Sequence, residues 1–189
     1  MRKALTLLLL FAVIGFSCKK NNEPATSVND SYQPVTKGSY WKYKLGFTQP
    51  TIYTVTMTGG TELINGRLYY KYNTSINEQA SFGSGAFYSA NGIVMSKGSD
   101  NIFLKENAAL AETWPYGNGT FMKVLEKGIS HNVEGKVFNN VIHLKYIKQI
   151  SAGVTVDLGD YYIAKGIGMI EQRSSDNVNF SLLTEYVIK

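Results

Sequence analysis

The sequence predicts an all-β domain built from antiparallel strands, and three observations support this fold class. Apolar and polar residues alternate within segments 53–58, 142–146 and 180–188, and a period of two places one face of a strand on the core. Two Asn-Gly pairs lie between strand-like segments, as in tight hairpins. No segment is long and helical enough for the crossovers of a parallel sheet. The strands are therefore expected to pair antiparallel.

The first 17 residues resemble an export signal that ends at a lipid-attachment site. Arg2 and Lys3 precede an apolar run over 4–16, which is shorter than the roughly 20 residues of a membrane-spanning helix. Cys18, the only cysteine, follows. We predict a signal peptide at 1–17 and acyl chains on Cys18, which would bind a membrane without any spanning helix. The alternative is an ordinary signal peptide that leaves a free or buried thiol.

Residues 18–37 are predicted to form the lipidated cysteine and a flexible tether, because they are polar, contain two prolines and lack periodicity. Residues 38–189 then form a single β domain, long enough to bury a core. Without 1–17 the chain has 17 basic and 14 acidic side chains, and its longest basic cluster is Lys19-Lys20. Nucleic acid is therefore not an expected partner. A single cysteine also excludes an intramolecular disulfide.

The turns of the first half are the most specific local features. Asn65-Gly66 separates strand-like segments, and so does Asn91-Gly92. Both pairs predict type I′ hairpins, since both turn positions need positive φ. Segment 105–111 alone has a helical composition, and it is short enough for one or two turns at most.

The two halves of the chain resemble each other in sequence. Segments 87–95 and 161–169 share five of nine residues, and the order of further matches is the same in both halves. They pair 64–69 with 133–138 and Trp41 with Trp114. We interpret 38–110 and 111–189 as tandem repeats of about 70 residues. The alternative is that the two halves are not duplicated and match only because β-hairpins in general have similar sequences. Two such units form either a β-sandwich or an open or half barrel, and the sequence leaves both open.

Segments 135–142 and 161–170 together resemble uncharacterised Bacteroidetes-type outer-membrane lipoproteins, in which a Gly-x-x-Phe strand precedes a Tyr-Tyr-x-Ala-x-Gly-x-Gly strand pair. The string 112–114 resembles a motif of the same proteins, and the likeness covers most of 110–172. The end of the signal, 16–20, resembles theirs too, although Gly15 stands where Leu or Val is usual. Related patterns are similar to curved half-barrels that shelter lipid. The resemblance implies no catalytic or ligand-binding residue.

No arrangement of residues predicts catalysis, a metal site or a cofactor. His131 and His143 are the only histidines, and neither has the spacing of a zinc site. His143 alternates out of step with its apolar neighbours, which predicts a solvent-facing position. Asp157 and Asp160 flank a predicted turn. We therefore do not expect an enzyme, although a Ser-His-Asp triad, which is recognised by geometry, stays open.

Aromatic side chains are the candidate binding residues. Adjacent residues of a strand point to opposite faces, so each aromatic cluster should place one ring outside when the other is in the core. Exposed Tyr or Trp rings stack on sugars or anchor protein partners. The alternative is that Tyr is simply a favoured strand residue. The candidates are Tyr40, Trp41, Tyr70, Trp114, Tyr161 and Tyr162.

These observations predict a non-enzymatic, lipid-anchored protein of the cell envelope that binds an envelope protein, a glycan or an apolar ligand. The second hypothesis is a carrier of a lipid or other apolar ligand in a curved sheet, and a hydrolase is the third. A carrier requires a continuous cavity, whereas a surface binder requires a filled core and an exposed aromatic patch. The anchor is expected in the outer membrane. Its periplasmic face is favoured over the cell surface, because only Glu23 is acidic among 19–23.

Overall fold

The computed structural model describes residues 30–46, 51–79, 82–98 and 101–189. These residues form an all-β structure of antiparallel strands, which confirms the predicted class. The strands are β1 (Tyr40–Leu45), β2 (Thr51–Ile64), β3 (Arg67–Ile76), β4 (Gly83–Ala90), β5 (Ile93–Ser96), β6 (Ile102–Lys105), β7 (Thr113–Gly117), β8 (Thr120–Val133), β9 (Lys136–Ser151), β10 (Val154–Ala164), β11 (Gly168–Ser174) and β12 (Phe180–Val187).

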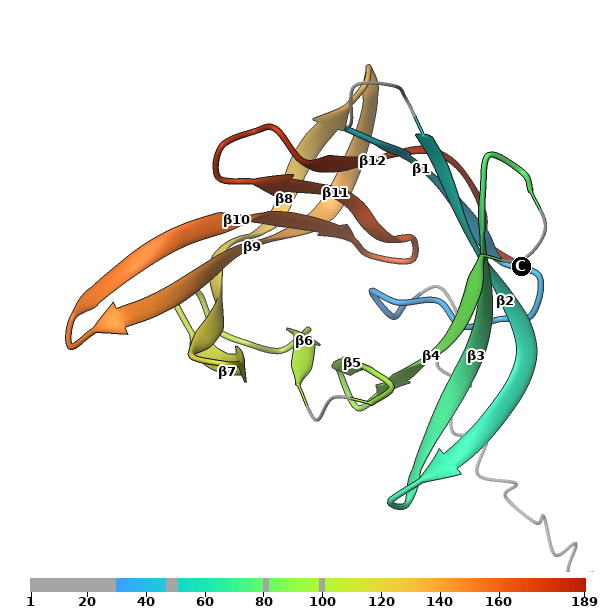
Figure 1. The fold of residues 1–189 in the computed structure, drawn as a ribbon, viewed down its shortest axis with the longest axis horizontal. Coiled ribbons are helices and arrows are strands. Elements are labelled where there is room, and N and C mark those ends of the chain that lie inside the picture. Colours follow the sequence, from blue (N-terminus) through green and yellow to red (C-terminus); the bar gives the residue numbers. More distant parts are fainter. Residues whose placement is uncertain (1–29, 47–50, 80–81, 99–100) are drawn as a thin grey trace, which may run out of the picture.

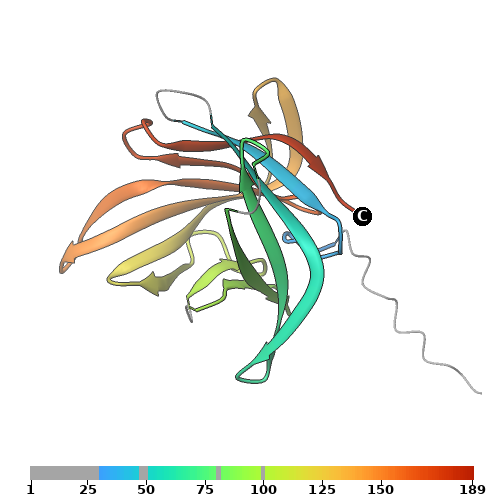
Figure 2. The same cartoon turned by 45° about the vertical axis from the view of Figure 1, so that its right-hand side comes forward.

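All twelve strands belong to one sheet that curls nearly into a barrel (Figures 1 and 2). Consecutive strands are neighbours within β1 to β6 and within β7 to β12, and β1 also pairs with β12. The edges are β6 and β7, which share no ladder; we call the gap between these two strands the seam. Of the two architectures left open by the sequence, the sandwich is wrong and the open barrel is correct.

The two Asn-Gly turns have the predicted backbone. Asn65 and Gly66 connect β2 to β3 with φ of 49° and 75°, and Asn91 and Gly92 connect β4 to β5 with φ of 54° and 72°. Both positions of each turn are left-handed, as a type I′ hairpin requires.

The helical turn predicted at 105–111 does not form. The chain instead makes two tight turns, with backbone bonds from Ala108 to Lys105 and from Glu112 to Ala109. The Glu112 carboxylate accepts a hydrogen bond from the Ala109 amide (2.9 Å), and Ala111 adopts a φ of 64°. Lys127 donates to the carbonyl of Ala108 (2.8 Å). Because these partners satisfy the backbone, the helical propensity of the segment is overridden.

Residues 30–37, which the sequence analysis assigned to the tether, lie against the sheet. The Tyr32 amide and the Ser31 hydroxyl both donate to the Glu106 carboxylate (2.9 and 3.1 Å), in the loop between β6 and β7. The Gly166 amide, in the turn between β10 and β11, donates to the Ser31 carbonyl (2.9 Å). This segment therefore links two distant turns, and the ordered domain includes it rather than beginning at residue 38.

Each half of the chain supplies six strands, β1 to β6 and β7 to β12. Trp41 and Trp114 lie in the first strand of each half, and each indole N–H donates to a backbone carbonyl: that of Ile167 (2.5 Å) and that of Ile102 (2.8 Å). The Trp114 bond crosses the seam. The tandem-repeat interpretation itself stays a prediction.

The turn end of the long β8–β9 hairpin lies over the outer face of β1 and β12. Near its turn, Glu134 pairs with Lys44 of β1 (2.6 Å), and Lys136 donates to the carbonyl of Thr184 in β12 (2.7 Å). Leu182 pairs in register with Lys44 and so faces outward, yet it is only 6% exposed. The hairpin therefore covers the outer face of the neighbouring strands.

Candidate binding cavity

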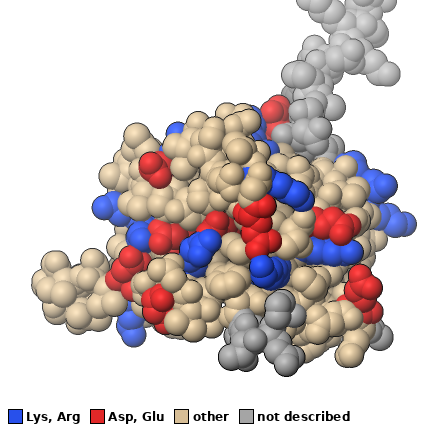
Figure 3. Space-filling model, turned by 90° about the horizontal axis from the view of Figure 1, so that it is seen from above, with Lys and Arg blue, Asp and Glu red and all other residues tan. Residues whose placement is uncertain are grey.

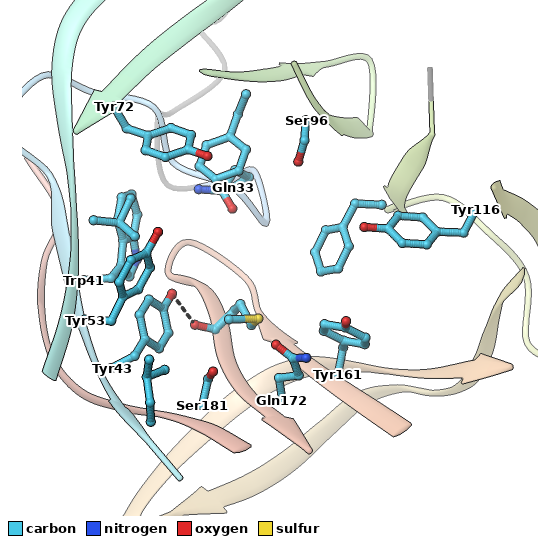
Figure 4. A pocket seen from close by; sticks show the side chains of 15 residues that line it. Gln33, Trp41, Tyr43, Tyr53, Tyr72, Ser96, Tyr116, Tyr161, Gln172 and Ser181 are labelled. Atoms are coloured by element: carbon cyan, nitrogen blue, oxygen red, sulfur yellow. Dashed lines mark hydrogen bonds between the residues drawn. The ribbon is translucent and has the colours of Figure 1, made fainter. Parts of the chain in front are cut away.

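The concave side of the sheet encloses a cavity of about 350 Å³ (Figure 4). Its walls come from β1 to β7 and from β10 to β12, and Gln33 adds to them from the N-terminal segment. Eight of the lining side chains are aromatic, and three more are aliphatic or thioether. The aromatic residues are Trp41, Tyr43, Tyr53, Tyr72, Phe87, Phe103, Tyr116 and Tyr161.

Strand alternation decides which rings reach the cavity. On β1, Trp41 and Tyr43 line it, whereas Tyr40 lies on the other face and donates its hydroxyl hydrogen to Glu185 (2.5 Å). On β10, Tyr161 lines the cavity and its neighbour Tyr162 faces outward. The expectation that adjacent rings divide between the two faces is therefore confirmed at both clusters.

A glycine makes room for one wall of the cavity. Tyr72 of β3 lies opposite Gly85 of β4, and a Cβ added to Gly85 would come within 2.3 Å of the Tyr72 hydroxyl oxygen. The Tyr72 ring stacks on Phe87 with centroids 4.5 Å apart and planes inclined by 24°. Tyr72 can therefore lie flat across the neighbouring strand only because that position has no side chain.

The opposite wall is a set of rings in edge-to-face contact. Phe103 of β6 meets Tyr161 of β10 at 5.3 Å and Tyr116 of β7 at 6.4 Å, and Tyr116 meets Tyr146 at 5.6 Å. Such aromatic pairs prefer tilted geometry, which holds their planes at fixed angles. Because Phe103 and Tyr116 belong to different edge strands, side chains close the seam where the backbone does not.

The polar side chains that line the cavity are neutral. Tyr43 donates to the carbonyl of Met169 (3.0 Å). The other four tyrosine hydroxyls make no hydrogen bond within the described part of the chain, and Figure 4 shows them in the walls around the open space. They belong to Tyr53, Tyr72, Tyr116 and Tyr161. None of the lining residues carries a formal charge.

Burial raises the pKa of three of these phenols, those of Tyr72, Tyr116 and Tyr161. Desolvation raises the pKa of Tyr161 well above its ordinary value, and the nearby Tyr116 and Tyr146 raise it further. The pKa of Tyr72 and that of Tyr116 are raised by the same cause. Each hydroxyl can therefore both donate and accept a hydrogen bond.

The structure brings two of the six predicted binding aromatics, Trp41 and Tyr161, to the cavity. Tyr40 and Tyr162 lie on the outer face, Trp114 is buried beside the seam at 2% exposure, and Tyr70 borders a separate depression next to Ser31. The other aromatic residues of the lining were not among the six candidates, although Tyr43 and Tyr72 belong to the aromatic clusters of the sequence; they are Tyr43, Tyr53, Tyr72, Phe87, Phe103 and Tyr116. Tyr53 belongs to a recognised alternating segment, which showed that it shares a face with Val55 but not that this face is concave.

Both histidines lie on the outer face, in a cluster with Tyr162. The Tyr162 ring stacks between His131 (3.7 Å between centroids) and His143 (4.3 Å). His143 was predicted to face solvent, but it is only 9% exposed. Its two ring nitrogens contact Glu126 (3.0 Å) and Asp160 (2.6 Å).

Neither histidine has a nucleophile beside it. His131 contacts the buried Glu171 (2.8 Å), and no serine or threonine hydroxyl of the described residues bonds to either ring. Asp157 and Asp160 lie within β10, beside a bulge, rather than in the predicted turn. Within residues 30–46, 51–79, 82–98 and 101–189, no group of three or more His, Cys, Asp or Glu side chains could hold a metal ion.

Charged side chains of both signs are interspersed on the face seen in Figure 3. Among the described residues, oppositely charged side chains form pairs across strands, including Lys145 with Asp160 (2.8 Å) and Lys42 with Glu185 (3.2 Å). This face is therefore mixed in charge, in contrast to the uncharged cavity.

The predicted signal peptide, Cys18 and most of the predicted tether lie outside the described residues. In the part of the chain that the structure describes, no helix has the length and apolar character needed to cross a membrane.

No protein-family model matches the sequence, and no curated protein does. Two solved structures are similar. One is a candidate exported protein with a YmcC-like fold from Bacteroides fragilis NCTC 9343, at 9% identity and a TM-score of 0.49, with 80% of this chain and 96% of that chain covered. The other is a candidate lipoprotein from Parabacteroides distasonis ATCC 8503, at 12% identity and a TM-score of 0.40, with 84% and 99% covered.

Proposed function

We propose that this chain is a non-enzymatic, lipid-anchored protein of the cell envelope that holds one small, uncharged and largely apolar ligand inside its curved sheet. The observation that carries this proposal is the aromatic cavity. A surface binder would have a filled core, whereas here eight aromatic rings surround an open space of about 350 Å³. The carrier hypothesis is therefore favoured over binding through an exposed aromatic patch.

The size and lining of the cavity match those of ligand sites in general. Pockets for small molecules measure roughly 300–1,000 Å³, and hydrophobic and aromatic side chains with a few polar groups line them. In this chain Leu45, Val55 and Met169 complete an apolar wall around neutral Gln and Ser side chains. An ion would lose its hydration here without gaining a charged partner. The ligand is therefore uncharged where it contacts the wall.

Native mass spectrometry tests the proposal on protein exported to a bacterial periplasm, with Cys18→Ser to prevent acylation and without detergent. We expect a reproducible added mass that denaturation releases. Ser181→Trp should abolish that mass, because residue 181 lines the cavity and a large ring would fill it. Thr56→Trp is the matched control, since Thr56 is exposed on the sheet.

The two variants distinguish a ligand bound in the cavity from a ligand bound elsewhere on the protein. An added mass that persists in Ser181→Trp would place the ligand elsewhere and contradict the proposal. A bare mass for the Cys18→Ser protein, in repeated preparations, would instead favour a partner on the outer surface, such as an envelope protein or a glycan.

We further propose that Cys18 anchors the domain to the outer membrane, on its periplasmic face. The single cysteine directly after an apolar segment supports this. Incorporation of labelled palmitate should be lost in Cys18→Ala. Protease treatment of intact cells tests the orientation: a resistant domain is expected, and cleavage at the surface would contradict the periplasmic placement.

We also propose that residues 38–110 and 111–189 are tandem copies. The β2–β3 turn at Gly66 corresponds to the β8–β9 turn at Gly135, and the β4–β5 hairpin to the β10–β11 hairpin. One rotation should therefore superpose Trp41 on Trp114 and Gly66 on Gly135. If the tryptophan pair and the glycine pair required two different rotations, the duplication would be contradicted.

A further inference from the structure

The cavity contains more unpaired hydrogen-bonding groups than a purely apolar ligand could satisfy. Tyr72 belongs to one wall, and Tyr116 and Tyr161 belong to the wall across the cavity (Figure 4). Their hydroxyls, like that of Tyr53, have no partner within the described residues. In the empty protein water can satisfy them, but a ligand that displaces this water must replace its hydrogen bonds.

We infer that the ligand is a neutral ring compound whose edge carries hydroxyl or carbonyl oxygens that bond to the tyrosine hydroxyls. This inference rests on the proposed function, because it assigns a chemical class to the ligand of the same cavity. The ring faces account for the cyclic shape, since flat ligands gain most from aromatic walls set at fixed angles. The unpaired hydroxyls account for the oxygens.

An aliphatic chain fits these walls poorly. It would leave buried phenols without partners, and a site built to bond a ligand oxygen rejects the analogue that lacks it by large factors, up to 10⁴–10⁵. A charged ligand is also disfavoured, because the lining has neither a cation nor an anion to pair with it. A neutral ring with polar edges satisfies both conditions.

Tyr43 provides an internal comparison. Its hydroxyl already donates to the Met169 carbonyl (3.0 Å), so that hydrogen is used within the protein wall. The hydroxyls of Tyr72 and Tyr161 have no such bond. Tyr72 and Tyr161, one in each of the facing walls, are two of the four tyrosines whose hydroxyl oxygens are available to select a ligand.

The test measures calorimetric affinities of the full-length protein, with Cys18→Ser, for three probes that share one ring system: naphthalene, dihydroxynaphthalene and naphthoate. We expect dihydroxynaphthalene to bind at least about tenfold more tightly than naphthalene, and naphthoate to bind most weakly. The double variant Tyr72→Phe and Tyr161→Phe keeps both rings and should weaken the preference severalfold while naphthalene affinity is retained. Tyr40→Phe, on the outer face, is the matched control and should keep the preference.

The outcomes separate this inference from the proposed function. Equal affinity for naphthalene and dihydroxynaphthalene, or a preference that is unchanged in the double Phe variant, would overturn the inference and leave an apolar carrier standing. Tightest binding of naphthoate would overturn the neutral class. If none of the three probes binds, the inference is overturned, whereas the proposed function is decided separately by the native mass spectrometry of the cavity variants.

Discussion

Trp114 is expected to hold the seam closed, because its indole provides a hydrogen bond between two strands that lack a ladder. It lies in β7 at 2% exposure and donates to the Ile102 carbonyl in β6 (2.8 Å). The informative change is Trp114→Phe, which keeps an aromatic ring but removes the N–H donor and one ring of the indole.

The structure allows the cost of this change to be estimated. The smaller ring buries roughly 40 Å² less apolar surface, which costs about 1 kcal/mol at roughly 25 cal/mol per Å². Loss of the indole hydrogen bond adds about 1 kcal/mol. A total of about 2 kcal/mol corresponds to a decrease of about 4–8 °C in the unfolding temperature for a domain of this size.

Urea unfolding followed by circular dichroism measures the global effect, and amide hydrogen exchange in β6 and β7 measures the local one. Tyr116→Phe is the control: its hydroxyl has no partner in the described residues, so its removal should change stability by less than about 0.5 kcal/mol. A loss of less than about 0.5 kcal/mol for Trp114→Phe, with unchanged exchange in both edge strands, would refute the reasoning.

Three further predictions concern a bulge, the outer hairpin and one carboxylate. Gly159→Ala should destabilise the protein by several kcal/mol, because the added Cβ would lie 2.1 Å from the Arg173 carbonyl oxygen. The control Gly135→Ala has open space around the added Cβ and should cost only about 1–2 kcal/mol. Similar urea midpoints for the two variants would contradict this prediction. Phe138→Ala should cost about 3–5 kcal/mol of stability if the β8–β9 hairpin packs on the barrel. Val137 is 63% exposed, so the control Val137→Ala should cost less than about 0.5 kcal/mol. Equal effects of the two variants in thermal unfolding would mean that the hairpin does not pack there. The pKa of Glu112 is lowered in the folded protein, mainly by the hydrogen bond from the Ala109 amide and also by Lys105. The ionised Glu112 therefore stabilises the fold above its unfolded pKa, and this stabilisation is lost as the pH falls through the lower folded pKa. Urea midpoints measured from about pH 5 to pH 3 should therefore decrease less for Glu112→Gln than for the unchanged protein, and parallel curves would count against the bond.

Local features of the fold could be predicted from the sequence, because they depend on neighbouring residues. The Asn65-Gly66 turn is determined by the backbone that Asn and Gly tolerate, and the alternation around Tyr53 identifies a strand. The helical turn expected at 105–111 does not form, because this segment depends on residues that are distant in the sequence. Its outcome depends on Lys127, which lies on a different strand and bonds to this loop.

The choice of a barrel over a sandwich depends on one long-range pairing. Trp41 lies opposite Tyr186, and nothing near either residue in the sequence specifies that partner. The cavity follows from the same closure. Alternation shows that Tyr161 and Tyr162 face opposite sides, but only the curvature of the complete sheet decides that Tyr161 faces inward.

The seam also affects the radius of the barrel. In a closed barrel, the number of strands and the stagger between them determine the radius, because the ladder runs all the way round. Here the ladder is interrupted between β6 and β7, so closure does not fix the radius. A small rotation about the Trp114 contact would change the circumference without breaking a ladder bond. If the proposed function holds, this freedom would let the same twelve strands accommodate ligands of different width.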